Sequence, residues 1–156
     1  MKKILLVIDM QNDFIDGSLG TPEAVSIVDN VVAKVKSYIA DPDGDVFATR
    51  DTHQPDYLQT QEGKNLPVEH CIEGTDGWQI RPEIAALIPE DHIFNKPTFG
   101  STELAAAMKE AYDAEAGDLT FELVGLCTDI CVASNALLLK ATMPEAVISI
   151  DPACCA

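Results

Sequence analysis

Cys131 is the residue whose type and position best suit covalent chemistry. It lies between an apolar run at 119–124, which predicts a strand, and an apolar pattern at 130–141, which predicts a helix. A cysteine at such a junction meets unpaired backbone N–H groups and the positive end of a helix dipole. Both favour the thiolate, the reactive form of cysteine, so Cys131 is a candidate nucleophile. The alternative is a small buried hydrophobic residue, which is the commoner fate of a free cysteine.

Four further polar residues each follow the end of a predicted strand: Asp9, Asp51, His53 and Lys96. In a parallel sheet the carboxyl ends of the strands share the edge where ligands bind, so these side chains would gather beside Cys131. An acid, a base and a thiol together can carry out nucleophilic acyl transfer, in which the carboxylate accepts the thiol proton and the ammonium stabilises the thiolate. Taken singly, Asp9 could simply cap a turn and Lys96 could be a solvated surface lysine.

Residues 50–79 show no periodicity and form a long loop that is rich in possible metal ligands. A loop of this length in a compact domain is usually functional or disordered, and its histidines and aromatic residues argue against disorder. Two imidazoles and two carboxylates could bind one ion: Asp51, His53, Glu62 and His70. Scattered polar loop residues are an equally good explanation. Phe14 and Trp78 are candidates for a wall that binds a ring, although each is more often a core residue.

The order of the predicted elements is typical of a three-layer α/β fold. Strands are expected at 3–8, 45–49, 92–95, 119–125 and 146–150, and helices at 22–39, 82–87, 102–115 and 130–141. This alternation predicts one domain, residues 1–156, with a Rossmann-like parallel sheet in the order 3-2-1-4-5 and helices on both faces. The direction of winding reverses between the first and fourth strands, so Asp9 and Cys131 would flank a crevice.

Composition and charge argue against several classes of partner. The 156 residues include 26 acidic and 10 basic ones, which gives a formal charge of −16. Such a surface repels phosphate backbones and anionic lipids, so we expect neither nucleic acid nor membrane as a partner. No apolar run reaches membrane-spanning length, and Asp9 ends the first apolar run too early for a signal peptide. The five cysteines lack the paired spacing of a structural zinc site and predict a reducing cytoplasm rather than a disulfide framework.

Three separated segments, 7–14, 95–99 and 125–132, resemble the isochorismatase-like cysteine hydrolases, and within them the nicotinamidase/pyrazinamidase group. The resemblance covers nearly the whole chain. It implies a catalytic triad of Asp9, Lys96 and Cys131. It also implies a cis peptide bond between Leu126 and Cys127, with the N–H groups of Cys127 and Cys131 forming an oxyanion hole.

The resemblance further implies a divalent metal ion, zinc first with iron or manganese as alternatives, that holds the nitrogen of a pyridine ring. Asp51, His53 and His70 match the common ligand set, whereas the remaining histidine of the family falls near Tyr57, a poor ligand. Some relatives use a glutamate instead, and Glu62 resembles that residue. By the same analogy, Phe14 and Trp78 would sandwich the aromatic ring.

The reaction implied is the hydrolysis of nicotinamide to nicotinate and ammonia through a thioester on Cys131, as part of NAD salvage. Two alternatives stay open: a related hydrolase of another small amide, imide or carbamoyl compound, and a catalytically inactive relative that serves as a binding or assembly subunit. Family members usually continue past a segment like 151–156 into another helix and strand, so the domain is expected to lack these elements. The last strand would then be a sheet edge that could recruit a second copy, giving a homo-oligomer.

Overall fold

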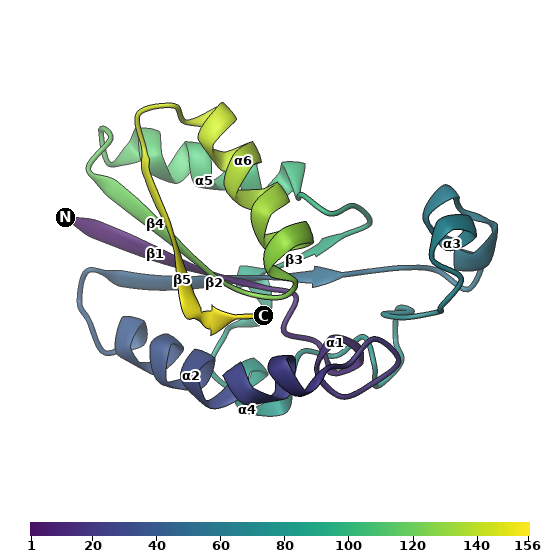
Figure 1. Ribbon diagram of the computed structural model, residues 1–156. Coiled ribbons are helices and arrows are strands. Elements are labelled where there is room, and N and C mark those ends of the chain that lie inside the picture. Colours follow the sequence, from purple (N-terminus) through teal and green to yellow (C-terminus); the bar gives the residue numbers. More distant parts are fainter.

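Five parallel strands form a single sheet through the centre of the computed structural model, which describes residues 1–156 (Figure 1). Their order is β3-β2-β1-β4-β5, as predicted. The strands are β1 (Lys2–Ile8), β2 (Gly44–Asp51), β3 (Ile93–Lys96), β4 (Leu119–Gly125) and β5 (Val147–Cys155). The chain therefore starts in the middle of the sheet, builds one half outward and returns to build the other half.

Helices cover both faces of this sheet. The helices are α1 (Asn12–Ile15), α2 (Pro22–Ile39), α3 (Gln61–Asn65), α4 (Pro82–Ala85), α5 (Thr102–Ala114) and α6 (Ala133–Thr142). Figure 1 shows α2 and α4 on one face, α5 and α6 on the other, and α3 projecting beyond the end of β2. The two long helices before the fourth strand begin as predicted, because the hydroxyls of Thr21 and Ser101 accept the N–H groups of Ala24 and Leu104. None of the helices has the length and apolar character needed to cross a membrane.

The central strand separates two hydrophobic cores. Leu5 and Val7 of β1 belong to the core beneath α2 and α4, whereas Leu6 and Ile8 belong to the core beneath α5 and α6. Successive side chains of a strand point to opposite faces, so a strand that is apolar at every position is buried on both. This explains why the unbroken apolar run near the N-terminus forms the middle of the sheet.

Several boundaries differ from the prediction, and β2 extends through Asp51 rather than ending at Thr49. The last strand continues past Ile150 to Cys155, because its end pairs again with Gly125 after an irregularity in the register. The loop at 50–79 contains one 3₁₀ turn, Tyr57–Gln59, and the short helix α3. The helix predicted from residue 130 starts as a π-turn, Thr128–Val132, before α6 continues it.

The carboxyl ends of β1 and β4 approach each other very closely. A Cβ atom on Gly125 would lie 2.1 Å from the carbonyl oxygen of Ile8, and the φ of this glycine is +120°. Only glycine fits such a contact and such a conformation. The chain leaves β4 directly beside the end of β1, so the π-turn and the residue after β1 face the same crevice.

Candidate active site

Asp9, Lys96 and Cys131 meet at this crevice, although they come from three different elements. Lys96 Nζ lies 2.7 Å from Asp9 Oδ2 and donates a hydrogen bond to Cys131 Sγ at 3.4 Å. Lys96 is the last residue of β3 and pairs in register with Asp51 of β2, so its side chain reaches across β2 to the end of β1. All three side chains are buried. The structure thus brings together the three residues of the predicted triad.

Asp9 is held in an unusual backbone conformation. It follows β1 with a φ of +48°, a region that few residues other than glycine adopt and that often marks functional sites. The hydroxyl of Thr49, on β2, donates a hydrogen bond of 2.7 Å to Asp9 Oδ1. The other carboxylate oxygen, Oδ2, has the ion pair with Lys96 and no hydrogen-bond partner besides it. This oxygen is free to accept a proton.

The electrostatics of the triad bear on the predicted thiolate. Burial raises the pKa of the Cys131 thiol, and the Asp9 carboxylate adds to this shift while Lys96 opposes it. Cys131 is the fourth residue of the helical segment that the π-turn begins and α6 continues. Burial and the Asp9 carboxylate therefore oppose the predicted thiolate, whereas Lys96 favours it.

Burial acts in opposite directions on the pKa values of the two partners of Cys131. Burial lowers the pKa of Lys96, but the neighbouring anionic groups, Asp9 first among them, raise it by more. Burial raises the pKa of Asp9, and the ion pair with Lys96 offsets part of that shift. A proton acceptor of raised pKa therefore lies in the same buried cluster as a thiol that must lose its proton.

Cys127, the residue before the π-turn, has the backbone geometry expected of an oxyanion-hole donor. The Leu126–Cys127 peptide bond is cis, as predicted. The N–H of Cys127 donates to no acceptor within the protein, whereas its carbonyl accepts from Ile130 and Val132. An unpaired N–H beside a nucleophile is a candidate donor to an oxyanion.

One polar residue of α6 fixes the position of Cys131. The buried amide of Asn135 donates to the carbonyl oxygens of Cys131 at 2.8 Å and of Phe99 at 3.1 Å. Its Oδ1 accepts the N–H of Ser101 at 2.9 Å. Asn135 therefore ties the π-turn to the loop between β3 and α5. It was not among the predicted site residues, and the signal that could have found it is a polar residue one turn after the cysteine in an apolar helix.

The four predicted metal ligands form a second cluster, which adjoins the triad because Asp51 Oδ1 lies 3.8 Å from Lys96 Nζ. The donor atoms of Asp51, His53 and His70 lie within 4.8 Å of one another, and all three residues are buried. Asp51 Oδ2 is 3.0 Å from His53 Nε2 and 3.5 Å from His70 Nε2. Glu62 Oε1, from α3, is 3.6 Å and 3.7 Å from the same two nitrogens.

These separations suit a metal ion. A tetrahedral ion with bonds of about 2.0–2.2 Å would hold its ligand atoms about 3.3–3.6 Å apart. His70 Nδ1 lies 2.8 Å from the carbonyl oxygen of Val68, which can only accept, so Nδ1 carries a proton and Nε2 is the nitrogen that faces the cluster. The hydrogen bonds from the two imidazoles help to hold the pKa of Asp51 below its usual range despite its burial. The residues present fit a divalent cation.

Tyr57 packs beside this cluster without belonging to it. Its hydroxyl donates to the carbonyl oxygen of Leu66 at 2.9 Å, and its ring lies 4.7 Å from the ring of His53 and 5.0 Å from that of His70. Burial raises the pKa of Tyr57 to about 12, so the phenol is neutral at physiological pH. This supports the expectation that Tyr57 is a poor ligand.

Two side chains near α1 hold the ligand segment in place. Gln11 accepts the N–H of Asp51 and donates to the carbonyl oxygens of Asp51 and Trp78, each at 2.8 Å. Asp13 Oδ2 accepts the N–H of Cys71, whose φ is +48°, at 2.8 Å. The residues on which the cluster depends are therefore fixed by the segment that follows β1.

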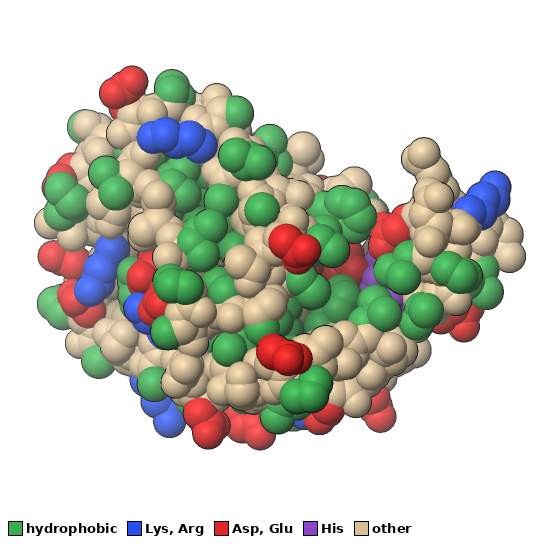
Figure 2. Space-filling model, in the orientation of Figure 1, with side chains coloured by type: hydrophobic (Ala, Val, Ile, Leu, Met, Phe, Trp, Pro, Cys, Tyr) green, Lys and Arg blue, Asp and Glu red, His purple; other side chains and the backbone are tan.

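Residues of both clusters line one cavity of about 240 Å³, although Asp9, Lys96 and His53 are not among them. Cys131 and Cys127 contribute to one side of its wall, and Asp51, Glu62 and His70 to the other. The remaining wall is apolar and comprises Phe14, Leu19, Leu66, Phe99 and Ile130. Figure 2 shows a hollow between the part that carries α3 and the rest of the molecule, with histidine and acidic side chains at its base.

Trp78 does not line this cavity. The guanidinium of Arg50 stacks over its ring at 3.9 Å, and its indole Nε1 donates to the hydroxyl of Thr52 at 2.9 Å. A cation and a hydrogen-bond acceptor hold the indole beside β2, which explains why the structure does not place it where the predicted role requires. Of the two predicted ring-binding residues, only Phe14 lies in the wall.

A family model described as the isochorismatase domain matches residues 3–144. The chain belongs to the isochorismatase family. It is 30% identical over 149 residues to the Bacillus subtilis (strain 168) protein named "Uncharacterized isochorismatase family protein PncA", and the match covers 88% of this chain and 78% of that protein. This confirms the predicted family and the predicted enzyme class, a hydrolase.

Two solved structures of this isochorismatase family are similar over the full length of the chain. Nicotinamidase/pyrazinamidase PncA from Bacillus subtilis has a TM-score of 0.79 at 28% identity, covering 100% of this chain and 87% of that one. N-carbamoylsarcosine amidase from Thermoplasma acidophilum has a TM-score of 0.78, also at 28% identity, covering 100% and 84%. The fold of the family is thus shared throughout, while two amidases of different substrates are equally similar in sequence.

Four wall residues of this isochorismatase-family site were missed by the analysis of the sequence: Leu19, Leu66, Phe99 and Ile130. Phe99 and Ile130 have a signal in the sequence, because each lies within three residues of a predicted catalytic residue. Leu66 has none, because it follows α3 in the segment without periodicity.

Proposed function

We propose that this isochorismatase-family hydrolase is a metal-containing cysteine amidase that converts nicotinamide to nicotinate and ammonia. The observation that carries the proposal is that Cys131 of a buried Asp–Lys–Cys cluster and Asp51 and His70 of a buried Asp–His–His cluster line one small cavity with an apolar wall. The first cluster suits acyl transfer, and the second suits a cation that orients a ring.

In the first half of the reaction, Asp9 Oδ2 accepts the thiol proton as Cys131 Sγ attacks the carboxamide carbon. Lys96, 3.4 Å from the sulfur, stabilises the negative charge that develops there. The unpaired N–H of Cys127, together with that of Cys131, would bind the oxyanion of the tetrahedral intermediate. Asp9 then gives its proton to the nitrogen, the C–N bond breaks, and ammonia leaves a thioester on Cys131.

In the second half, water replaces ammonia. Asp9 takes a proton from the water, whose oxygen attacks the thioester carbon, and the C–S bond breaks to give the carboxylic acid product. The sulfur recovers its proton from Asp9. The sum is one carboxamide and one water converted to one carboxylic acid and one ammonia, which exchange a proton in water to give carboxylate and ammonium, with Asp9 and Cys131 unchanged.

Asp51, His53 and His70 would hold the divalent ion, with Glu62 as the fourth ligand. Zinc suits this mixture of nitrogen and oxygen donors, and iron or manganese are the alternatives. When bound, such an ion supplies a Lewis-acid position for a ring nitrogen. Phe14 lies in the adjoining wall, its ring 5.5 Å from that of His70, where an aromatic substrate would pack.

A second candidate is the hydrolysis of a carbamoyl compound, because the carbamoylsarcosine amidase is as similar to this chain as the nicotinamidase. The apolar wall, with Phe14, Leu66 and Phe99, favours a ring over a small polar acid. Ammonia release measured in parallel from nicotinamide, pyrazinamide and N-carbamoylsarcosine separates the two candidates.

The proposal is tested by ammonia release and metal content in Cys131→Ala and His53→Ala, with Cys155→Ala on β5 as a matched cysteine control. Cys131→Ala is expected to lose at least about 10⁴-fold in turnover while it retains metal. His53→Ala is expected to bind less metal and to bind nicotinamide more weakly, and Cys155→Ala is expected to resemble the wild type. Wild-type turnover in Cys131→Ala would reject the nucleophile.

A further inference from the structure

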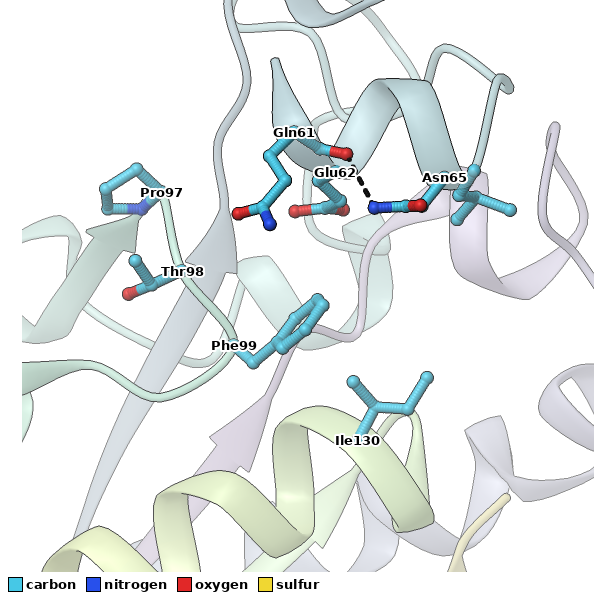
Figure 3. A pocket seen from close by; sticks show the side chains of 8 residues that line it. Gln61, Glu62, Asn65, Pro97, Thr98, Phe99 and Ile130 are labelled. Atoms are coloured by element: carbon cyan, nitrogen blue, oxygen red, sulfur yellow. Dashed lines mark hydrogen bonds between the residues drawn. The ribbon is translucent and has the colours of Figure 1, made fainter.

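A second, larger cavity lies outside the one that holds the triad. Its volume is about 500 Å³, and eight residues line it: Gln61, Glu62, Asn65, Leu66, Pro97, Thr98, Phe99 and Ile130. Figure 3 shows that α3 forms one side, the segment after β3 forms the facing side, and Ile130 lies on the π-turn below. The inner cavity, at about 240 Å³, is smaller than most small-molecule sites, which measure roughly 300–1,000 Å³.

The two cavities adjoin each other and share part of their walls. Four residues line both of them: Glu62, Leu66, Phe99 and Ile130. A molecule whose carboxamide lies at Cys131 and whose ring lies along the inner wall would therefore extend directly into the outer cavity. The outer cavity is thus part of the same path through the protein and not a separate surface feature.

Exposed apolar side chains converge on this path from three different elements. Leu66 after α3 is 40% exposed, Phe99 after β3 is 48% exposed, and Ile130 on the π-turn is 42% exposed. Large apolar residues that are left exposed around one hollow indicate a surface that a ligand covers. A passage through which substrate only enters could equally well be polar. The apolar wall therefore indicates a group that stays bound against it.

The charge of the wall restricts that occupant. None of the eight lining residues is basic, and Glu62 is the one charged side chain among them. The side-chain amide of Gln61 makes no hydrogen bond within the protein, and Figure 3 shows it directed into the hollow. The wall therefore suits an uncharged group and disfavours an anionic one.

We propose that the outer cavity is a second substrate subsite, which accepts an uncharged aromatic or alkyl extension of the carboxamide. This inference rests on the proposed function, because it places the reacting carboxamide at Cys131. The preferred substrates are accordingly primary carboxamides longer than a single ring. The wall shared with the inner cavity assigns the outer one to the far end of the substrate rather than to a second copy of the chain.

The test compares nicotinamide with nicotinamides that carry a phenyl group at ring position 5 or 6, and with the same compounds carrying a carboxylate on the phenyl group. Values of kcat/KM from ammonia release would be measured for the wild type, Gln61→Trp and Gln61→Ala. Gln61 lines the outer cavity alone and is exposed, so tryptophan fills that cavity without disturbing the core. Calorimetric Kd values for the same compounds in a Cys131→Ala background give a readout that needs no turnover.

At least one phenyl compound is expected to match or exceed nicotinamide in kcat/KM, and its carboxylated form to fall roughly tenfold below it. Gln61→Trp should lower kcat/KM for the phenyl compound by about tenfold and leave nicotinamide within about twofold, whereas Gln61→Ala should leave both within about twofold. The Kd values should follow the same order.

Two results would overturn the subsite: phenyl compounds that bind and react less than roughly one-tenth as well as nicotinamide, or a Gln61→Trp variant that affects both compounds alike. A change in oligomeric state of Gln61→Trp without a change in substrate preference would likewise overturn it in favour of a second copy. If a phenyl compound turns over but nicotinamide does not, nicotinamide is the wrong substrate, and the proposal of an outer subsite stands. If no carboxamide turns over, the proposed function fails, and the Kd values alone decide the subsite.

Discussion

The two walls of the inner cavity are held in place by different parts of the fold. On the catalytic wall, Asp9 and Lys96 stand at the ends of β1 and β3, and the register of the sheet determines their separation. On the metal wall, Asp51 is the last residue of β2, but His53, Glu62 and His70 come from the irregular segment 52–79, whose one sheet-like contact is an isolated bridge. The first wall is a property of the sheet, and the second depends on individual side chains.

Each wall nevertheless has one buried amide that joins it to the rest of the molecule. Asn135 binds the backbone of Cys131 and Phe99 on the catalytic wall, and Gln11 binds the backbone of Asp51 and Trp78 on the metal wall. A side-chain amide offers donors and acceptors in one plane, so it can satisfy backbone groups of two segments at once. The catalytic wall has this clamp in addition to the sheet, whereas the metal wall relies on its clamp and on Asp13.

The largest expected effect is on the catalytic wall. Asp9→Asn keeps the shape of the side chain and an acceptor for Thr49, but it removes the proton acceptor and the charge that pairs with Lys96. We expect kcat to fall by about 10²–10⁴-fold with metal content unchanged. Ammonia release together with metal analysis measures both quantities. Loss of metal in this variant would show that the two walls are not independent.

The metal wall should respond differently when its clamp is removed. Gln11→Met leaves the backbone groups of Asp51 and the carbonyl oxygen of Trp78 without partners, so the ligand segment is no longer fixed. We expect metal affinity to fall about 10–100-fold, as is typical when groups that orient ligands are lost. Turnover should recover when metal is added in excess, which a competition titration with a chelator can follow. Failure to recover with metal fully bound would mean that Gln11 acts on the triad as well.

The corresponding change on the catalytic wall should be milder, because the sheet also positions its residues. Asn135→Leu removes the bonds to the carbonyl oxygens of Cys131 and Phe99 and to the N–H of Ser101. We expect a decrease in kcat of about tenfold and a loss of roughly 1–3 kcal/mol in the free energy of unfolding. Metal affinity should not change. Denaturant unfolding, kinetics and chelator competition on one preparation test the three statements together.

The same contrast explains how much of the site could be predicted from the sequence. Asp9, Lys96 and Cys131 follow strands whose apolar patterns are clear, so the order of a parallel sheet was sufficient to bring them to one edge. The positions of Leu66 and Trp78 could not be obtained in this way, since residues 50–79 have no periodicity and each side chain there is placed by its own partners. The direction in which the pKa of Cys131 shifts could not be predicted from the sequence either, because it depends on burial and on the neighbouring charges of Asp9 and Lys96.

The smallest expected effect belongs to Trp78, and it tests which wall this residue serves. Its indole packs on Arg50 and donates to Thr52, outside the cavity, so Trp78→Phe should leave KM for nicotinamide within about twofold. It should lower the free energy of unfolding by about 1 kcal/mol, because the bond to Thr52 is lost while stacking on Arg50 remains. Phe14→Leu is the matched control, since Phe14 does line the cavity and its loss should raise KM by about tenfold. A tenfold rise in KM for Trp78→Phe would instead mean that the indole leaves Arg50 and contacts the substrate. The metal wall would then change conformation on substrate binding.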